Sequence, residues 1–156
     1  MRARADSNRS GPDAELDARC GATWSPLEDL LRRADIVVVL CALTPETRGL
    51  LSAERLALLK PDALLINAAR GEVVDQAALA ALLRTRPGMK AGLDVTTPEP
   101  LPLDSELLTL PNCLVLPHIG SAGEQARADM VRISLENAVA GVDGRPLTAE
   151  VPRPIA

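Results

Sequence analysis

Short apolar runs alternate with amphipathic segments along most of the chain. The clearest run, residues 35–41, is β-branched and apolar without polar alternation, which is typical of a strand covered on both faces of a sheet. Further runs at 63–66, 91–95 and 113–116 also predict strands, and a brief strand is expected at 22–24. The pattern therefore predicts a sheet built from short strands.

Segments with helix-capping residues lie between these runs. Ser25, Ser52 and Asp75 each have a side chain that suits the N-cap of a following helix. Strands that alternate with helices in this way predict an α/β fold with a parallel sheet and helices on both faces. The helix that Asp75 caps is predicted over residues 76–84. Two further helices are predicted over residues 12–19 and 122–140.

Polar residues follow four successive predicted strands where each one ends. Segments 42–44 and 67–71 follow two of the strands, and Asp94 and His118 stand at the ends of the other two. Because ligands of parallel α/β sheets bind outside the carboxyl ends of the strands, these residues are expected to gather at one binding edge.

His118 is the single histidine of the sequence, and histidine is the residue type that best suits proton delivery near neutral pH. Each candidate also has a plain structural interpretation when it is taken alone. His118 and Arg70 fit exposed loop positions, Asp94 fits a turn cap, and Glu99 fits a solvated charge.

Composition excludes several classes of protein. The chain has 156 residues, of which 47% are hydrophobic, and a net charge of −4, which suits one globular domain and gives no nucleic-acid footprint. The three cysteines and one histidine form no metal-binding or disulfide pattern, so no metal is expected. The longest apolar run, 36–43, is too short to span a membrane, and we expect a cytoplasmic protein.

Three strings at these strand ends resemble motifs of the D-isomer-specific 2-hydroxyacid dehydrogenases. They are INAARGEVVD at 66–75, GLDVTTPEP at 92–100 and LPHIGSA at 116–122, in the family's order and spacing. The resemblance covers roughly residues 8–147. Within the family, residues 99–102 and 108–113 look most like the glyoxylate/hydroxypyruvate reductases.

The resemblance implies a Rossmann-like NAD(P)-binding domain and a role for each catalytic candidate. His118 would donate a proton to the carbonyl oxygen of a 2-keto acid, Glu99 would hydrogen-bond the other ring nitrogen and favour the imidazolium, and Arg70 would bind the substrate carboxylate. The cofactor would supply the hydride. The implied cofactor-binding residues are Asn8, Arg9, Ser10, Ala42, Thr44, Ala68, Asp94 and Gly120.

The sequence contains no GxG pair, although the family's phosphate-binding loop is rich in glycine. We therefore expect a partial doubly wound sheet over residues 1–120 that lacks its first strands and this loop. Residues 121–156 are expected to form a helix and tail that return to an absent substrate domain, with the apolar face of the helix exposed. Residues 1–11 are polar, and residues 6–11 predict a loop, in which Arg9 favours NADP over NAD by resemblance.

The expected function is that of the C-terminal part of an NAD(P)-dependent oxidoreductase that reduces 2-keto acids to D-2-hydroxy acids, as a glyoxylate/hydroxypyruvate reductase does. The whole enzyme is expected to be a homodimer, and this chain alone is expected to be inactive. Two alternatives remain open at this point. The chain could come from a phosphoglycerate, D-lactate or formate dehydrogenase, or it could be a non-catalytic nucleotide-binding or inert fragment.

Overall fold

The computed structural model describes residues 5–8, 11 and 13–150. The chain divides into two compact units, residues 1–118 and 119–156. The first unit contains both β-sheets, and the second contains one long helix. The candidate residues other than Gly120 belong to the first unit.

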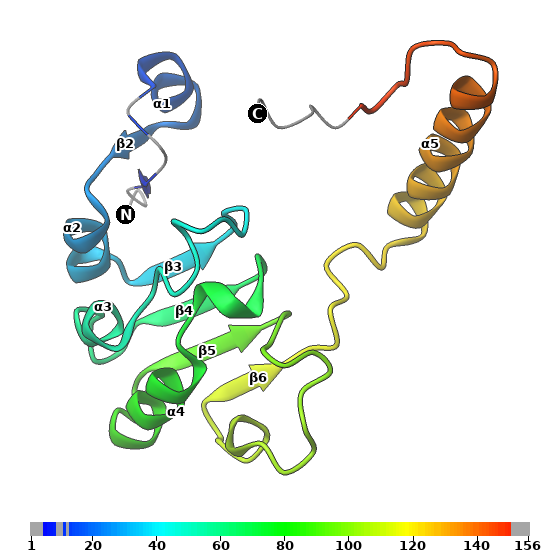
Figure 1. Cartoon of the computed structure of the whole chain (residues 1–156). Helices are drawn as coiled ribbons and strands as arrows, with labels where there is room; N and C mark the ends of the chain where they lie inside the picture. The colour runs from blue at the N-terminus through cyan, green and yellow to red at the C-terminus, as the bar shows by residue number, and fades with distance from the viewer. Residues whose placement is uncertain (1–4, 9–10, 12, 151–156) are drawn as a thin grey trace. The chain divides into compact units, whose positions relative to one another are not determined.

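Four parallel strands form the main sheet of the first unit (Figure 1). In spatial order they are β3 (Ile36–Val39), β4 (Leu64–Asn67), β5 (Lys90–Leu93) and β6 (Cys113–Val115). Each strand pairs with the next one in sequence, so consecutive carboxyl ends lie side by side. The predicted α/β fold with a parallel sheet is confirmed.

A second sheet contains two parallel strands, β1 (Ala5–Ser7) and β2 (Ala22–Trp24). The prediction of a loop over residues 6–11 is therefore wrong at Asp6 and Ser7, which belong to β1. The sequence of β1 is short and polar, and it is extended because its backbone pairs with β2 from Ala5↔Ala22 to Ser7↔Trp24. Tertiary pairing overrides local propensity here.

The helices lie close to their predicted positions. Pro12, the expected start of the first helix, lies outside the described residues, as do Arg9 and Ser10. The observed helices are α1 (Ala14–Cys20), α2 (Leu27–Arg33), α3 (Ala53–Ala57), α4 (Gln76–Thr85) and α5 (Glu124–Val142), with short 3₁₀ turns η1 (Gly71–Val73) and η2 (Glu106–Leu108).

Two of the three predicted helix caps are confirmed. Ser52 accepts from the amide of Arg55, and Asp75 accepts from the amide of Ala78. Ser25 does not cap α2, because the helix begins at Leu27 and Pro26 takes the N-cap position. The Ser25 hydroxyl instead accepts a 2.7 Å hydrogen bond from the Arg33 guanidinium.

The core lies between one face of the main sheet and the helices α2, α3 and α4. Val37 and Leu65 of the sheet belong to the same buried cluster as Leu31, Leu56 and Leu79 of these three helices. All five side chains are at most 6% exposed. Their packing holds the strands, and with them the strand ends, on a rigid support.

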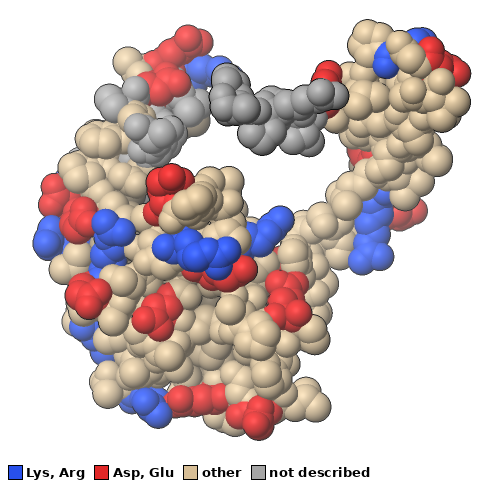
Figure 2. All heavy atoms as spheres, in the orientation of Figure 1, with Lys and Arg blue, Asp and Glu red and all other residues tan. Residues whose placement is uncertain are grey.

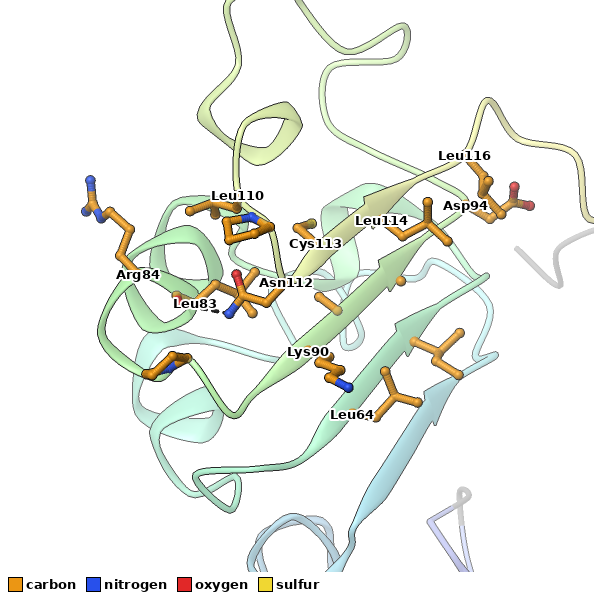
Figure 3. A pocket seen from close by; sticks show the side chains of 15 residues that line it. Leu64, Leu83, Arg84, Lys90, Asp94, Leu110, Asn112, Cys113, Leu114 and Leu116 are labelled. Carbon is orange, nitrogen blue, oxygen red and sulfur yellow. Dashed lines mark hydrogen bonds between the residues drawn. The ribbon is translucent and has the colours of Figure 1, made fainter.

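The opposite face of the sheet is open to solvent. Ile36 is 60% exposed, Val38 51% and Leu114 61%, so the expectation that residues 35–41 are covered on both faces is wrong. The cause is that the described helices of the core pack on a single side. Figure 3 shows Leu64 and Leu114 on this open face, where they line a shallow hollow of about 940 Å³.

The apolar side chains of α5 are also exposed, as the sequence predicts. Met130, Leu135 and Val139 are all more than half exposed. No helix among the described residues has both the length and the apolar character needed to span a membrane. In Figure 2 basic and acidic side chains are interspersed over the visible face of the first unit.

The two faces of β3 give a direct test of this packing. Val37→Ala removes two core methyl groups, and at about 0.8 kcal/mol per buried CH₂ we expect the free energy of unfolding to fall by about 1.5 kcal/mol or more. Val38→Ala, on the open face, should change it by less than about 0.5 kcal/mol. Urea unfolding of both variants checks this, and equal losses would show that both faces are covered in solution.

Candidate active site

The turn after β4 is built around a buried asparagine. Asn67, at 1% exposure, accepts from the amide of Ala69 through Oδ1 and donates from Nδ2 to the carbonyl of Arg70 at 3.0 Å. Its side chain thereby determines the path of residues 68–70. Sequence reasoning gave Asn67 no role of its own, although an asparagine at a strand end is a known signal for a side-chain-stabilised turn.

Arg70 projects from this turn and is exposed. Its Nη1 donates to the carbonyl of Ala69 at 2.6 Å, and Arg70 does not line the cavity beside His118. Among the residues that the structure describes, no hydrogen bond or ion pair joins the Arg70 guanidinium to Glu99 or His118.

The backbone at Gly71 packs tightly against the loop that follows β5. A Cβ atom at Gly71 would lie 2.1 Å from the carbonyl carbon of Thr96 and 2.5 Å from the hydroxyl of Thr97. Only glycine permits this close approach. The Arg70 turn and the loop that carries Glu99 are thus in direct contact.

Glu99 and His118 form the closest polar pair of the predicted site. Glu99 Oε1 lies 2.6 Å from His118 Nδ1, and the two side chains are 41% and 44% exposed. Because a carboxylate offers only acceptors, Nδ1 is the donor and Nε2 is the second ring nitrogen, available for another partner. The predicted hydrogen bond between Glu99 and the imidazole is present.

A cavity of about 580 Å³ lies beside this pair. Leu101, Leu108 and Val115 contribute apolar side chains to its wall. Asp94 and Thr96 line it as well. A few polar groups in an apolar hollow are the usual composition of a site for a small organic substrate.

Several predicted cofactor residues lie at successive strand ends. Thr47 joins the turn after β3, since its hydroxyl donates to the carbonyl of Ala42 and accepts from the amide of Thr44. Ala68 follows β4 and is exposed. The amide of Asp94, after β5, donates to the Asn67 carbonyl at 3.0 Å. These mostly small residues fit a flat ligand laid across the strand ends.

The predicted cofactor residues also include Asn8, Arg9, Ser10 and Gly120. Gly120 belongs to the second unit. The side-chain amide of Asn8 donates from Nδ2 to the carbonyl of Ser25 at 2.9 Å. Arg9 and Ser10 fall outside the described residues.

Cys113 on β6 gives no sign of thiol chemistry. Burial raises the pKa of its thiol, which keeps the sulfur protonated and makes it a poor nucleophile or metal ligand near neutral pH. Among the residues that the structure describes, no group of three His, Cys, Asp or Glu side chains could hold a metal ion.

A parallel sheet with such residues at its carboxyl edge, beside a carboxylate–imidazole pair, indicates the class of dinucleotide-binding α/β domains. A family model described as "D-isomer specific 2-hydroxyacid dehydrogenase, NAD binding domain" matches residues 5–120. The chain belongs to this family, and its predicted Rossmann-like fold is confirmed.

Known relatives agree with this assignment. Glyoxylate/hydroxypyruvate reductase B of Enterobacter agglomerans is 47% identical over 131 residues, which are 84% of this chain and 41% of the relative. The solved TT0316 protein of Thermus thermophilus is 41% identical, with a TM-score of 0.87 over 96% of this chain and 46% of that one.

A third similar protein was solved with a cofactor. The D-isomer specific 2-hydroxyacid dehydrogenase of Xanthobacter autotrophicus Py2, in complex with NADPH and MES, is 38% identical. Its TM-score is 0.73 over 96% of this chain and 60% of that one. The chain therefore spans less than two thirds of each of these three proteins.

The tight contact at Gly71 predicts a specific sensitivity. Gly71→Ala would push a methyl group into the Thr96 backbone, and we expect a loss of about 1–3 kcal/mol in the free energy of unfolding. Gly123→Ala is the matched control, because no atom lies within 4 Å of the position that its added methyl group would take. Urea titration of both variants checks this, and an unchanged midpoint for Gly71→Ala would contradict the close approach.

Proposed function

We propose that this chain is the cofactor-binding and proton-donating part of an NAD(P)-dependent enzyme that reduces 2-keto acids to D-2-hydroxy acids. The observation that carries the proposal is the 2.6 Å contact between Glu99 Oε1 and His118 Nδ1 at the sheet edge. The similarity to a glyoxylate/hydroxypyruvate reductase supports glyoxylate and hydroxypyruvate as substrates.

The proposed reaction gives each ring nitrogen of His118 a separate task. Glu99 holds Nδ1–H and stabilises the positive charge of the imidazolium. Nε2–H then protonates the carbonyl oxygen, and a reduced nicotinamide bound in the cleft would supply the hydride for the carbonyl carbon. The Nε2–H bond breaks as the O–H bond forms, the carbonyl π bond is lost, and the imidazole becomes neutral.

Arg70 is proposed to bind the substrate carboxylate. Its guanidinium is exposed and donates to a neighbouring main-chain carbonyl in the structure. A planar guanidinium can exchange that neutral partner for two charge-assisted bonds to a carboxylate. The direct contact between Gly71 and Thr96 keeps the base of this side chain close to the Glu99 loop.

The proposed cofactor cleft runs along Ala42, Thr44, Ala68 and Asp94, with Gly120 as a further contact. NADP is preferred over NAD because Asn8, Arg9 and Ser10 match the position of the ribose 2′-phosphate by resemblance. The NADPH complex of the Xanthobacter autotrophicus relative supports NAD(P) use in general, and the preference for NADP rests on the resemblance alone. Homodimer formation and a cytoplasmic location of the whole enzyme stay predictions.

A chimera tests the proposed function. The 131 matched residues of the Enterobacter agglomerans reductase are replaced by those of this chain, and NADPH or NADH oxidation is followed with glyoxylate, hydroxypyruvate or pyruvate against a blank without keto acid. We expect turnover with the first two acids and NADPH. Preference for pyruvate would identify a different substrate class, and no turnover with any acid would reject the catalytic proposal.

His118→Asn in this chimera should lower kcat about 10²- to 10⁴-fold, because the general acid is removed. The Kd of NADPH should change little, since the imidazole donates to substrate and not to the cofactor. Steady-state kinetics and fluorescence titration of NADPH measure the two effects. Unchanged turnover would exclude His118 as the proton donor.

Glu99→Gln in the chimera should lower kcat for keto-acid reduction about tenfold or more, with the Kd of NADPH unchanged. The reason is that a neutral amide forms a weaker bond to the ring than a carboxylate does and stabilises the positive charge of the imidazolium less. Glu54→Gln is the control, because Glu54 is an exposed carboxylate on α3 that bonds Ser52. Equal kcat values for Glu99→Gln and the parent chimera would contradict the role of Glu99.

A further inference from the structure

The loop that carries Glu99 is clamped to the start of α4 by one side chain. Gln76, the first residue of α4, donates from Nε2 to the carbonyl of Thr97. The amide of Thr97 in turn donates to Gln76 Oε1 at 2.8 Å. Two reciprocal hydrogen bonds hold both sides of one residue's main chain, two positions before Glu99.

The clamp starts from a rigid base. Asp75 caps α4 by accepting from the amide of Ala78, and its own amide donates to the carbonyl of Leu51 at 3.0 Å. Leu79, one turn into the helix, is fully buried. The backbone of Gln76 is therefore fixed on both sides, and its side chain transmits this position to Thr97.

The His118 imidazole is held less firmly than the Glu99 loop. His118 has a φ of 55°, in the left-handed region that is uncommon for residues other than glycine. Its side chain is 44% exposed, and it bonds Glu99 at 2.6 Å. The orientation of the ring therefore depends on where the Glu99 loop places its carboxylate.

We infer that Gln76 is a positioning residue, which holds Glu99, and through it the His118 imidazole, by clamping the main chain of Thr97. The inference deepens the proposed function and rests on it for its catalytic meaning. The contacts run in order from Gln76 to Thr97, from Thr97 along the chain to Glu99, and from Glu99 to His118.

α4 offers a matched control at its other end. Asn112 also has a side-chain amide that binds main-chain groups of other elements. Its Nδ2 donates to the carbonyl of Leu83 (Figure 3) and to that of Met89. Asn112→Ala should loosen the C-terminal end of α4 and leave the Glu99 loop in place. A general loss of stability can thus be separated from a loss of positioning.

The test uses the full 156-residue chain and its single histidine. In ¹⁵N-labelled protein, the ring nitrogen and Nδ1–H resonances of His118 report the Glu99 bond without assignment ambiguity. Gln76→Ala should move these resonances more than halfway from the parent values to those of Glu99→Gln. Asn112→Ala should leave them at the parent values while lowering the urea midpoint.

Gln76→Glu gives a second variant that retains one of the two clamp bonds. It keeps an acceptor for the Thr97 amide and places a carboxylate against the Thr97 carbonyl, so we expect an intermediate displacement of the His118 resonances. If Gln76→Ala does not fold, Gln76→Glu tests the positioning role of Gln76 in its place. Parent-like His118 resonances in a folded Gln76 variant would overturn the inference.

Turnover of the chimera separates this inference from the proposed function. Gln76→Ala should lower kcat about ten- to a hundredfold through misplacement of the acid, with the Kd of NADPH unchanged. Displaced His118 resonances in a chimera without any turnover would reject the function and keep the positioning role. Full turnover with parent-like resonances would reject the positioning role alone.

Discussion

The main-chain hydrogen bonds between the parallel strands of the main sheet determine where the candidate groups at the strand ends lie. They continue past the strand ends into the site, where Ala68 donates to Val39, Asp94 to Asn67, and Leu116 to Leu93. Because each of these bonds joins neighbouring strand ends, the turns that follow the strands start from fixed relative positions. The Glu99–His118 contact depends on these fixed relative positions of the strand ends.

Short contacts between the turns then refine the site. Gly71 allows the Arg70 turn to lie directly against Thr96, and Gln76 binds the next residue, Thr97. Asn67 shapes the Arg70 turn from inside the structure. Gly71, Gln76 and Asn67 carry no charge, yet each one limits where a charged side chain can reach.

The two faces of the sheet play unequal parts in stability. The helices α2, α3 and α4 bury one face in an aliphatic core, whereas Ile36, Val38 and Leu114 remain exposed on the other. Apolar side chains on a parallel sheet are normally covered on both sides. The open face and the exposed apolar side chains of α5 are consequently the surfaces on which this chain is most prone to associate.

The sequence by itself determined the alternation of strands and helices after β1, the parallel sheet, the caps at Ser52 and Asp75, and the family, because these follow from local periodicity and from motifs that are contiguous in the chain. Tertiary structure decided what depends on contacts between distant segments. It made β1 a strand through pairing with β2, left one face of β3 open, and turned Arg70 towards Ala69. It also joined Gln76 to Thr97, a contact across 21 positions that no local pattern encodes, since a side-chain amide can bond any peptide group brought within reach.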